Sequence, residues 1–139
     1  MYEYNCKIVR VVDGDTVDIE CDLGWNITVG GSSGRIRLHG LDTPETRTRD
    51  RAEKAHGLLA KACVEKHLKV GETYKLRTIK KGKFGRYLGI ITFNDKGDTI
   101  NDLLIELLLG VPYHGENRAT IRALHEKNRK ELVKQGLLE

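Results

Sequence analysis

The sequence lacks a hydrophobic stretch long enough to cross a lipid bilayer. Its longest nearly apolar run, Leu103–Val111, is interrupted by Glu106 and is far shorter than the roughly 20 residues of a membrane-spanning helix. Cysteine is scarce as well. The three cysteines, Cys6, Cys21 and Cys63, are an odd number at wide spacing. We therefore expect neither a disulfide framework nor a disulfide-linked partner, and a reducing compartment is favoured.

The chain also lacks the sequence features of export and of several common catalytic sites. Residues 1–7 contain an acid where a signal peptide carries positive charge, and no apolar segment follows. We therefore expect a cytoplasmic location, with secretion left open if a signal was removed from the chain. The histidines and cysteines show neither HExxH nor CxxC spacing, which argues against a zinc site. Walker A and Gly-x-Ser-x-Gly patterns are absent too.

Charge is unevenly distributed along the 139 residues. Residues 1–46 hold 4 Lys/Arg against 8 Asp/Glu, whereas residues 47–86 hold 13 Lys/Arg against 4 Asp/Glu. This contrast indicates carboxylates able to hold a cation beside a surface that attracts a polyanion. Solvated helix and hairpin faces would produce the same contrast and remain an alternative. A hydrophobic content of 39% is typical of a folded chain, and we expect a single domain over residues 1–139. We also expect a monomer that does not associate with membranes.

β-branched runs and apolar–polar alternation predict five short strands, and an amphipathic pattern predicts helices. The strands are expected at residues 4–12, 17–21, 35–41, 73–79 and 87–93, and the helices at 50–68, 101–109 and 120–135. Residues 30–34 are predicted to form a flexible glycine-rich loop, and Asn101 is predicted to cap the second helix. A helix between the third and fourth strands matches an α+β fold, a five-stranded OB-fold Greek-key β-barrel with three helices.

Three clusters carry most of the polar chemistry. They are Val12–Val17 (VDGDTV), Arg35–Glu45 (RIRLHGLDTPE) and Lys81–Gly89 (KGKFGRYLG). Each alone is weak, because DGDT and DTPE also occur as ordinary turn sequences. Together and in this order they resemble the thermonuclease family, the staphylococcal-nuclease-like domains, over residues 4–113. The resemblance implies an OB-fold nuclease.

Asp15 and Asp42 are the candidate metal ligands. Asp15 has the strand parity of Val17 and Ile19, so its carboxylate is expected to point toward the barrel interior. A buried carboxylate is costly unless it is paired or bound to a metal. Asp42 directly follows the third predicted strand, and with the Thr43 carbonyl oxygen the two carboxylates make an all-oxygen site suited to Ca²⁺. The resemblance implies the same three residues. The alternative is a turn-forming Asp15 and a capping Asp42.

Arg37 and Arg86 are the candidate catalytic arginines that the resemblance implies. Guanidinium groups bind phosphate oxygens through two parallel hydrogen bonds and stay charged at any working pH. Two of them beside a cation suit phosphoryl transfer, in which charge spreads over the equatorial oxygens. Solvated strand-end arginines are the alternative, and Arg35 and Arg77 match no functional position of the family.

Glu45 resembles the family's catalytic glutamate, which activates or orients the attacking water; a surface glutamate is the alternative. Lys83, Tyr87 and Tyr113 are expected to contact phosphate or to stack on a base. The sequence therefore predicts Ca²⁺-dependent hydrolysis of phosphodiester bonds in DNA and also in RNA. The resemblance to the family implies 3′-phosphate products. The rival hypotheses are a catalytically silent nucleic-acid-binding OB module and a protein-interaction OB module.

Overall fold

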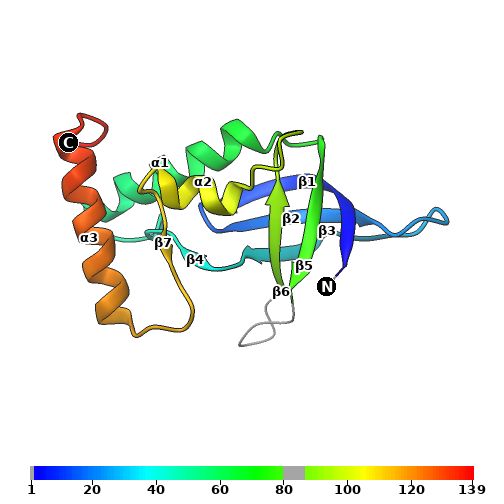
Figure 1. Cartoon of the computed structure of the whole chain (residues 1–139), viewed down its shortest axis with the longest axis horizontal. Helices are drawn as coiled ribbons and strands as arrows, with labels where there is room; N and C mark the ends of the chain where they lie inside the picture. The colour runs from blue at the N-terminus through cyan, green and yellow to red at the C-terminus, as the bar shows by residue number, and fades with distance from the viewer. Residues whose placement is uncertain (1, 80–86) are drawn as a thin grey trace.

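Five strands close into a barrel in the computed structural model, which describes residues 2–79 and 87–139 (Figure 1). The barrel strands are β1 (Glu3–Asp13), β2 (Thr16–Asp22), β3 (Thr28–Leu38), β5 (Thr73–Ile79) and β6 (Tyr87–Thr92), joined in the order β1-β2-β3-β6-β5. β1 pairs with β5 antiparallel and thereby closes the sheet, while β3 pairs with β6 parallel. The predicted OB-fold barrel is confirmed.

The barrel interior is filled by apolar side chains that alternate along the strands. Val17 and Ile19 on β2 are at most 3% exposed, and Cys21 follows them on the same face. Burying a side chain of this size contributes about 1.5–3 kcal/mol. Asp18 breaks the predicted pattern, because it is only 3% exposed although it lies on the outward face. Arg35, the residue paired with Asp18 on β3, covers the Asp18 side chain, and the Arg35 Nε lies 3.0 Å from the Asp18 Oδ1.

Residues 30–34 belong to β3, so the loop predicted there is wrong. The pairing of β2 with β3 shifts register between Asp18 and Glu20, which is the mark of a β-bulge. A Cβ on Gly34 would lie 2.1 Å from the carbonyl oxygen of Ile19. Glycine is required here because two backbones approach closely, and the strand continues through the segment.

The β2–β3 hairpin projects beyond the barrel on the side away from α3 (Arg118–Lys134) (Figure 1). Trp25 and Asn26 form its two-residue turn with φ of 55° and 60°, and the Ile27 N–H donates to the Gly24 carbonyl at 2.8 Å. Two successive positive φ values are typical of a type I′ hairpin turn. The turn lies at the end of β2 opposite Asp15.

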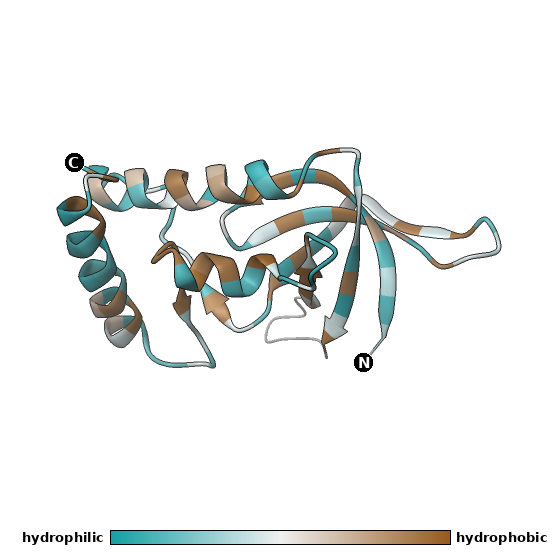
Figure 2. Cartoon of the chain, turned by 45° about the horizontal axis from the view of Figure 1, so that its top comes forward, coloured by the Kyte–Doolittle hydropathy of each residue, from teal (hydrophilic) through white to brown (hydrophobic). Residues whose placement is uncertain are grey.

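The described residues form three helices, of which α1 (Arg51–His67) packs on β1, α2 (Ile100–Glu106) packs on β6, and α3 lies beside β7 (Val111–Pro112) away from the barrel (Figure 1). α1 lies within the helix predicted over residues 50–68, and the carboxylate of its cap residue Asp50 accepts from two backbone N–H groups. α2 is capped by Thr99 and not by Asn101. α3 is capped by Asn117 and so begins two positions before its predicted start at Thr120. Figure 2 shows α2 as mostly hydrophobic and α3 as mostly hydrophilic.

None of the helices in the described ranges combines the length and apolar character that a membrane span requires.

The predicted third strand ends early. β3 stops at Leu38, the chain turns at His39 and Gly40, and Leu41–Asp42 forms a separate short strand, β4. β4 pairs with β7 (Val111–Pro112), so Asp42 lies opposite Val111. This second sheet carries Asp42 from the barrel wall toward the C-terminal helix.

Asn101 does not cap the helix, and its buried side chain instead forms hydrogen bonds that link separate segments of the chain. Its side chain is 5% exposed. It accepts from the Ile91 N–H at 3.2 Å and donates to the carbonyl oxygens of His39 and Gly89 at 3.0 and 3.1 Å. One amide thus joins α2, β6 and the segment that leads from β3 to β4.

We expect Asn101→Ala to lower the free energy of unfolding by about 3 kcal/mol, because it leaves the buried Ile91 N–H without this acceptor and removes two further hydrogen bonds. Asn94→Ala is the matched control. The Asn94 side chain also makes three hydrogen bonds, but at the surface, where water replaces them. Its cost should stay below about 1 kcal/mol. Urea denaturation measures both, and equal losses would contradict the assignment.

Candidate active site

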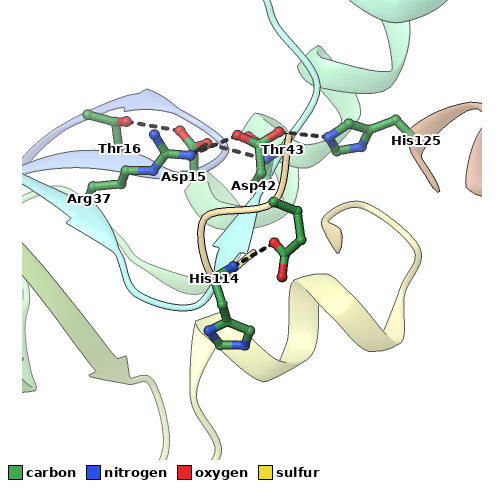
Figure 3. A network of polar contacts seen from close by, with 8 residues as sticks. Asp15, Thr16, Arg37, Asp42, Thr43, His114 and His125 are labelled. Atoms are coloured by element: carbon green, nitrogen blue, oxygen red, sulfur yellow. Dashed lines mark hydrogen bonds and ion pairs between the residues drawn. The ribbon is translucent and has the colours of Figure 1, made fainter. Parts of the chain in front are cut away.

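Two carboxylates from separate elements converge at the end of the barrel (Figure 3). Asp15 lies in the turn between β1 and β2 and is 9% exposed, and Asp42 ends β4. The Asp15 Oδ1 accepts from the Thr16 hydroxyl at 2.9 Å, and its Oδ2 accepts from the Thr43 N–H at 3.2 Å. The structure therefore brings together Asp15, Asp42 and Thr43, the three residues that the sequence analysis assigns to a metal.

The packing of the β1–β2 turn sets the position of Asp15. A Cβ on Gly14 would lie 2.8 Å from the Ala60 Cβ and 2.9 Å from the Thr43 Oγ1. The turn can approach α1 and Thr43 this closely only because residue 14 has no side chain. In addition, the Leu38 N–H donates to the Asp15 carbonyl oxygen at 2.8 Å. The DGD sequence thus fixes the carboxylate against β3 and the Thr43 backbone.

Arg37 on β3 bridges the two carboxylates. Its Nη2 lies 2.7 Å from the Asp42 Oδ1 and 3.5 Å from the Asp15 Oδ2, and its side chain is 20% exposed. The Arg37 Cζ lies 5.5 Å from the centre of the Tyr113 ring, within the range of a cation–π contact. Arg37 is thus held at the same point as both candidate metal ligands. Arg35 points elsewhere, to Asp18.

Negative charge exceeds positive charge among the described side chains of this centre. Burial raises the pKa of Asp15 above its ordinary value; Arg37 opposes the rise, and the neighbouring Asp42 carboxylate adds to it. The desolvation therefore outweighs the one guanidinium that lies within ion-pair distance among the described residues. A carboxylate in this state gains from any additional positive charge.

Glu45 lies at the edge of the same centre and remains accessible to solvent. Partial desolvation raises its pKa, and the nearby carboxyls of Asp15, Asp13, Asp42 and Glu53 raise it further. A carboxyl whose pKa moves toward neutral pH becomes a better acceptor for a proton during catalysis.

His125 belongs to this cluster, and the sequence analysis misses it. Its Nε2 lies 2.8 Å from the Asp42 Oδ2, and the residue is 7% exposed. A separation of 83 positions leaves no local pattern that links the two. The available signal is that His125 shares the buried face of a polar helix with Ile121 and Leu132.

Two of the other predicted residues, Tyr113 and Tyr87, lie within the described part of the chain. Tyr113 packs against Arg37, and Tyr87 begins β6 with 60% of its surface exposed. Lys83 and Arg86 lie outside the described residues, so their roles stay predictions. Within residues 2–79 and 87–139, no group of three or more His, Cys, Asp or Glu side chains could hold a metal ion. A cation bound by Asp15 and Asp42 therefore needs backbone oxygen or water as further ligands.

His56 on α1 lies beneath His125 and is fully buried. Its Nε2 lies 2.9 Å from the Leu108 carbonyl oxygen, and its ring centre is 6.2 Å from that of His125. Because a carbonyl only accepts, the His56 Nε2 carries the hydrogen. Burial lowers the pKa of His56 to about 4.

This shift predicts acid destabilisation. The unfolded chain binds the His56 proton below its ordinary pKa of 6.5, whereas the native protein resists it down to about 4. Stability is therefore lost as the pH falls through this window, by about 3 kcal/mol from this residue. His56→Gln keeps a donor for Leu108 and should flatten the pH dependence. Urea unfolding at several pH values measures the difference, and parallel curves for both proteins would contradict the assignment.

The chain is similar to one known protein family and to several known proteins. The model of the family described as staphylococcal nuclease homologue matches residues 35–135. The chain is 36% identical over 117 residues to Methanocaldococcus jannaschii MJ1439, described as uncharacterized, with 70% of this chain and 53% of that protein covered. It is 31% identical over 132 residues to the thermonuclease of Staphylococcus intermedius, and the match covers 94% of this chain and 72% of that protein. For the Staphylococcus hyicus thermonuclease the identity is 31% over 101 residues, and the match covers 68% of this chain and 54% of that protein.

The chain thus spans about half the length of two of these relatives and nearly three quarters of the other. The family match covers most of the chain, including β4, α1 and α3. The protein belongs to the staphylococcal nuclease homologue family.

Proposed function

We propose that this protein is a Ca²⁺-dependent nuclease that hydrolyses phosphodiester bonds in DNA and RNA. The observation that carries the proposal is the convergence of Asp15, Asp42 and Arg37 at one partly buried point, with Glu45 at its edge. Membership of a family that includes the staphylococcal thermonucleases supports it.

The donor set fits a hard divalent cation. Asp15 is a buried carboxylate whose pKa is raised by burial and by Asp42, so it lacks sufficient positive charge nearby. Carboxylate and carbonyl oxygens are the ligands that Ca²⁺ prefers, and its flexible geometry tolerates water in the remaining positions. Asp15, Asp42 and the Thr43 main-chain carbonyl would hold the ion. When bound, Ca²⁺ supplies positive charge beside a non-bridging phosphate oxygen.

The residues of the chain divide the remaining work. Arg37 uses one nitrogen on the carboxylates, which leaves other N–H groups of its planar fork for the phosphate. We assign the same role to Arg86 as a prediction. Glu45 orients the water and accepts its proton, and its raised pKa suits that task. Lys83, Tyr87 and Tyr113 are proposed to hold the flanking nucleotides.

The proposed reaction is an in-line displacement at phosphorus. A water oxygen forms the new bond to phosphorus, and the bond from phosphorus to the 5′ oxygen breaks. The proton of the attacking water passes to Glu45, and the departing oxygen takes up a proton from a solvent water to become a 5′-hydroxyl. The other product carries a 3′-phosphate.

Removing a ligand carboxylate should weaken Ca²⁺ binding. Asp15→Asn and Asp42→Asn each remove one negative charge from the proposed site and are expected to raise the Ca²⁺ dissociation constant roughly tenfold or more. Asp22→Asn is the control, because Asp22 is exposed and its carboxylate accepts a hydrogen bond from the Gly24 N–H that Asn can also accept. Isothermal titration calorimetry measures all three variants. Unchanged affinity in both site variants would remove Asp15 and Asp42 from the metal.

Arg37 should matter more for turnover than for binding. Arg37→Ala is expected to lower single-turnover cleavage of single-stranded DNA by roughly 10²–10³-fold, the usual loss for one preorganised donor, and Arg37→Lys should restore little. Arg77→Ala is the control: it removes the same charge from an exposed pair with Glu3, which contributes little.

DNA affinity without Ca²⁺ is measured in parallel and should change only modestly in both variants. A cleavage rate for Arg37→Ala within a few-fold of that for Arg77→Ala would refute a catalytic role for this arginine.

A further inference from the structure

Both oxygens of the Asp42 carboxylate are held, each from a different element (Figure 3). Arg37 on β3 donates to Oδ1 at 2.7 Å, and the Nε2 of His125 on α3 lies 2.8 Å from Oδ2. An ionised carboxylate only accepts hydrogen bonds, so the His125 Nε2 carries the hydrogen of this contact. Two donors from opposite sides therefore set the rotation of the Asp42 carboxylate.

His125 is itself held in place. Its side chain is 9% exposed and its ring packs perpendicular to that of His56, which is tethered to the Leu108 carbonyl at 2.9 Å. Within the described part of the chain, the Nδ1 of His125 has no hydrogen-bond partner. The one hydrogen bond of the His125 ring to these residues therefore goes to Asp42.

Packing alone does not call for histidine at this position. The other buried side chains on α3, Ile121 and Leu132, are apolar. An imidazole in such a place costs desolvation that an aliphatic side chain of similar volume avoids. The hydrogen bond to Asp42 is the interaction that an aliphatic residue could not make.

We propose that His125 is a positioning residue for the cation site. Its Nε2–H fixes the Asp42 carboxylate so that the remaining lone pairs face the position shared with Asp15, which makes α3 part of the site. This inference rests on the proposed function and extends it. Donors behind a metal-ligating group orient that group, and their loss typically costs about 10–100-fold in metal affinity.

The test compares variants that differ in whether they keep this donor. The amide nitrogen of His125→Gln reaches about as far as Nε2, whereas that of His125→Asn is too short and His125→Leu has none. We expect the Ca²⁺ dissociation constant to rise roughly 10–100-fold in the Leu and Asn variants and to stay within about threefold of wild type in Gln. The Ca²⁺ concentration for half-maximal cleavage should shift in parallel.

His67→Leu is the control, because His67 ends α1, bonds to the Cys63 carbonyl and contacts neither carboxylate. Calorimetry of the whole chain without nucleic acid measures affinity, and thermal unfolding identifies the folded variants. If the His125→Leu variant does not fold, the comparison is made between the His125→Asn and His125→Gln variants.

Folded Leu or Asn variants with wild-type affinity would overturn the positioning role while leaving the proposed function intact. A folded Gln variant as weak as Asn would also overturn it, since donor reach would then be irrelevant. A wild-type protein that binds no Ca²⁺ would overturn the proposed function and this inference together.

Discussion

One guanidinium held between two partly buried carboxylates organises the functional end of the molecule. Arg37 can contact both Asp15 and Asp42 because β3 pairs residue 37 with Thr16, directly beside Asp15. The barrel therefore determines the distance between one carboxylate and the arginine. The β4–β7 pairing then brings the second carboxylate to the same point.

This arrangement is poorly explained as a stability device. Buried ion pairs contribute little net stability, because desolvation offsets most of the attraction. Burial and the Asp42 carboxylate raise the pKa of Asp15 in spite of Arg37, and burial together with nearby carboxyls raises the pKa of Glu45. A protein selected only for stability would dispense with such a group. The proposed binding of a cation and a phosphate gives the group a role that stability does not.

Local sequence pattern was sufficient to predict most of the barrel strands, β2 by its alternation. Asp15 and Asp42 became candidate ligands only when the three sequence clusters were taken together and in order, and the structure places both carboxylates beside Arg37. Contacts between distant segments were not predictable in this way. The role of Gly34 depends on the Ile19 carbonyl across the bulge, and Asn101 bonds to strands that its own helix pattern does not reveal. His125 meets Asp42 only because α3 folds back beside β7.

In the proposed function, the carboxylate centre uses Ca²⁺ to break the bond between phosphorus and the 5′ oxygen. Its most direct test is to incubate an end-labelled DNA strand with the purified protein, in Ca²⁺ and in excess EGTA, and to determine the ends of the products. We expect fragments with 3′-phosphate and 5′-hydroxyl ends in Ca²⁺ and intact DNA in EGTA. Undiminished cleavage in EGTA, no cleavage in Ca²⁺, or fragments with 3′-hydroxyl ends would contradict it.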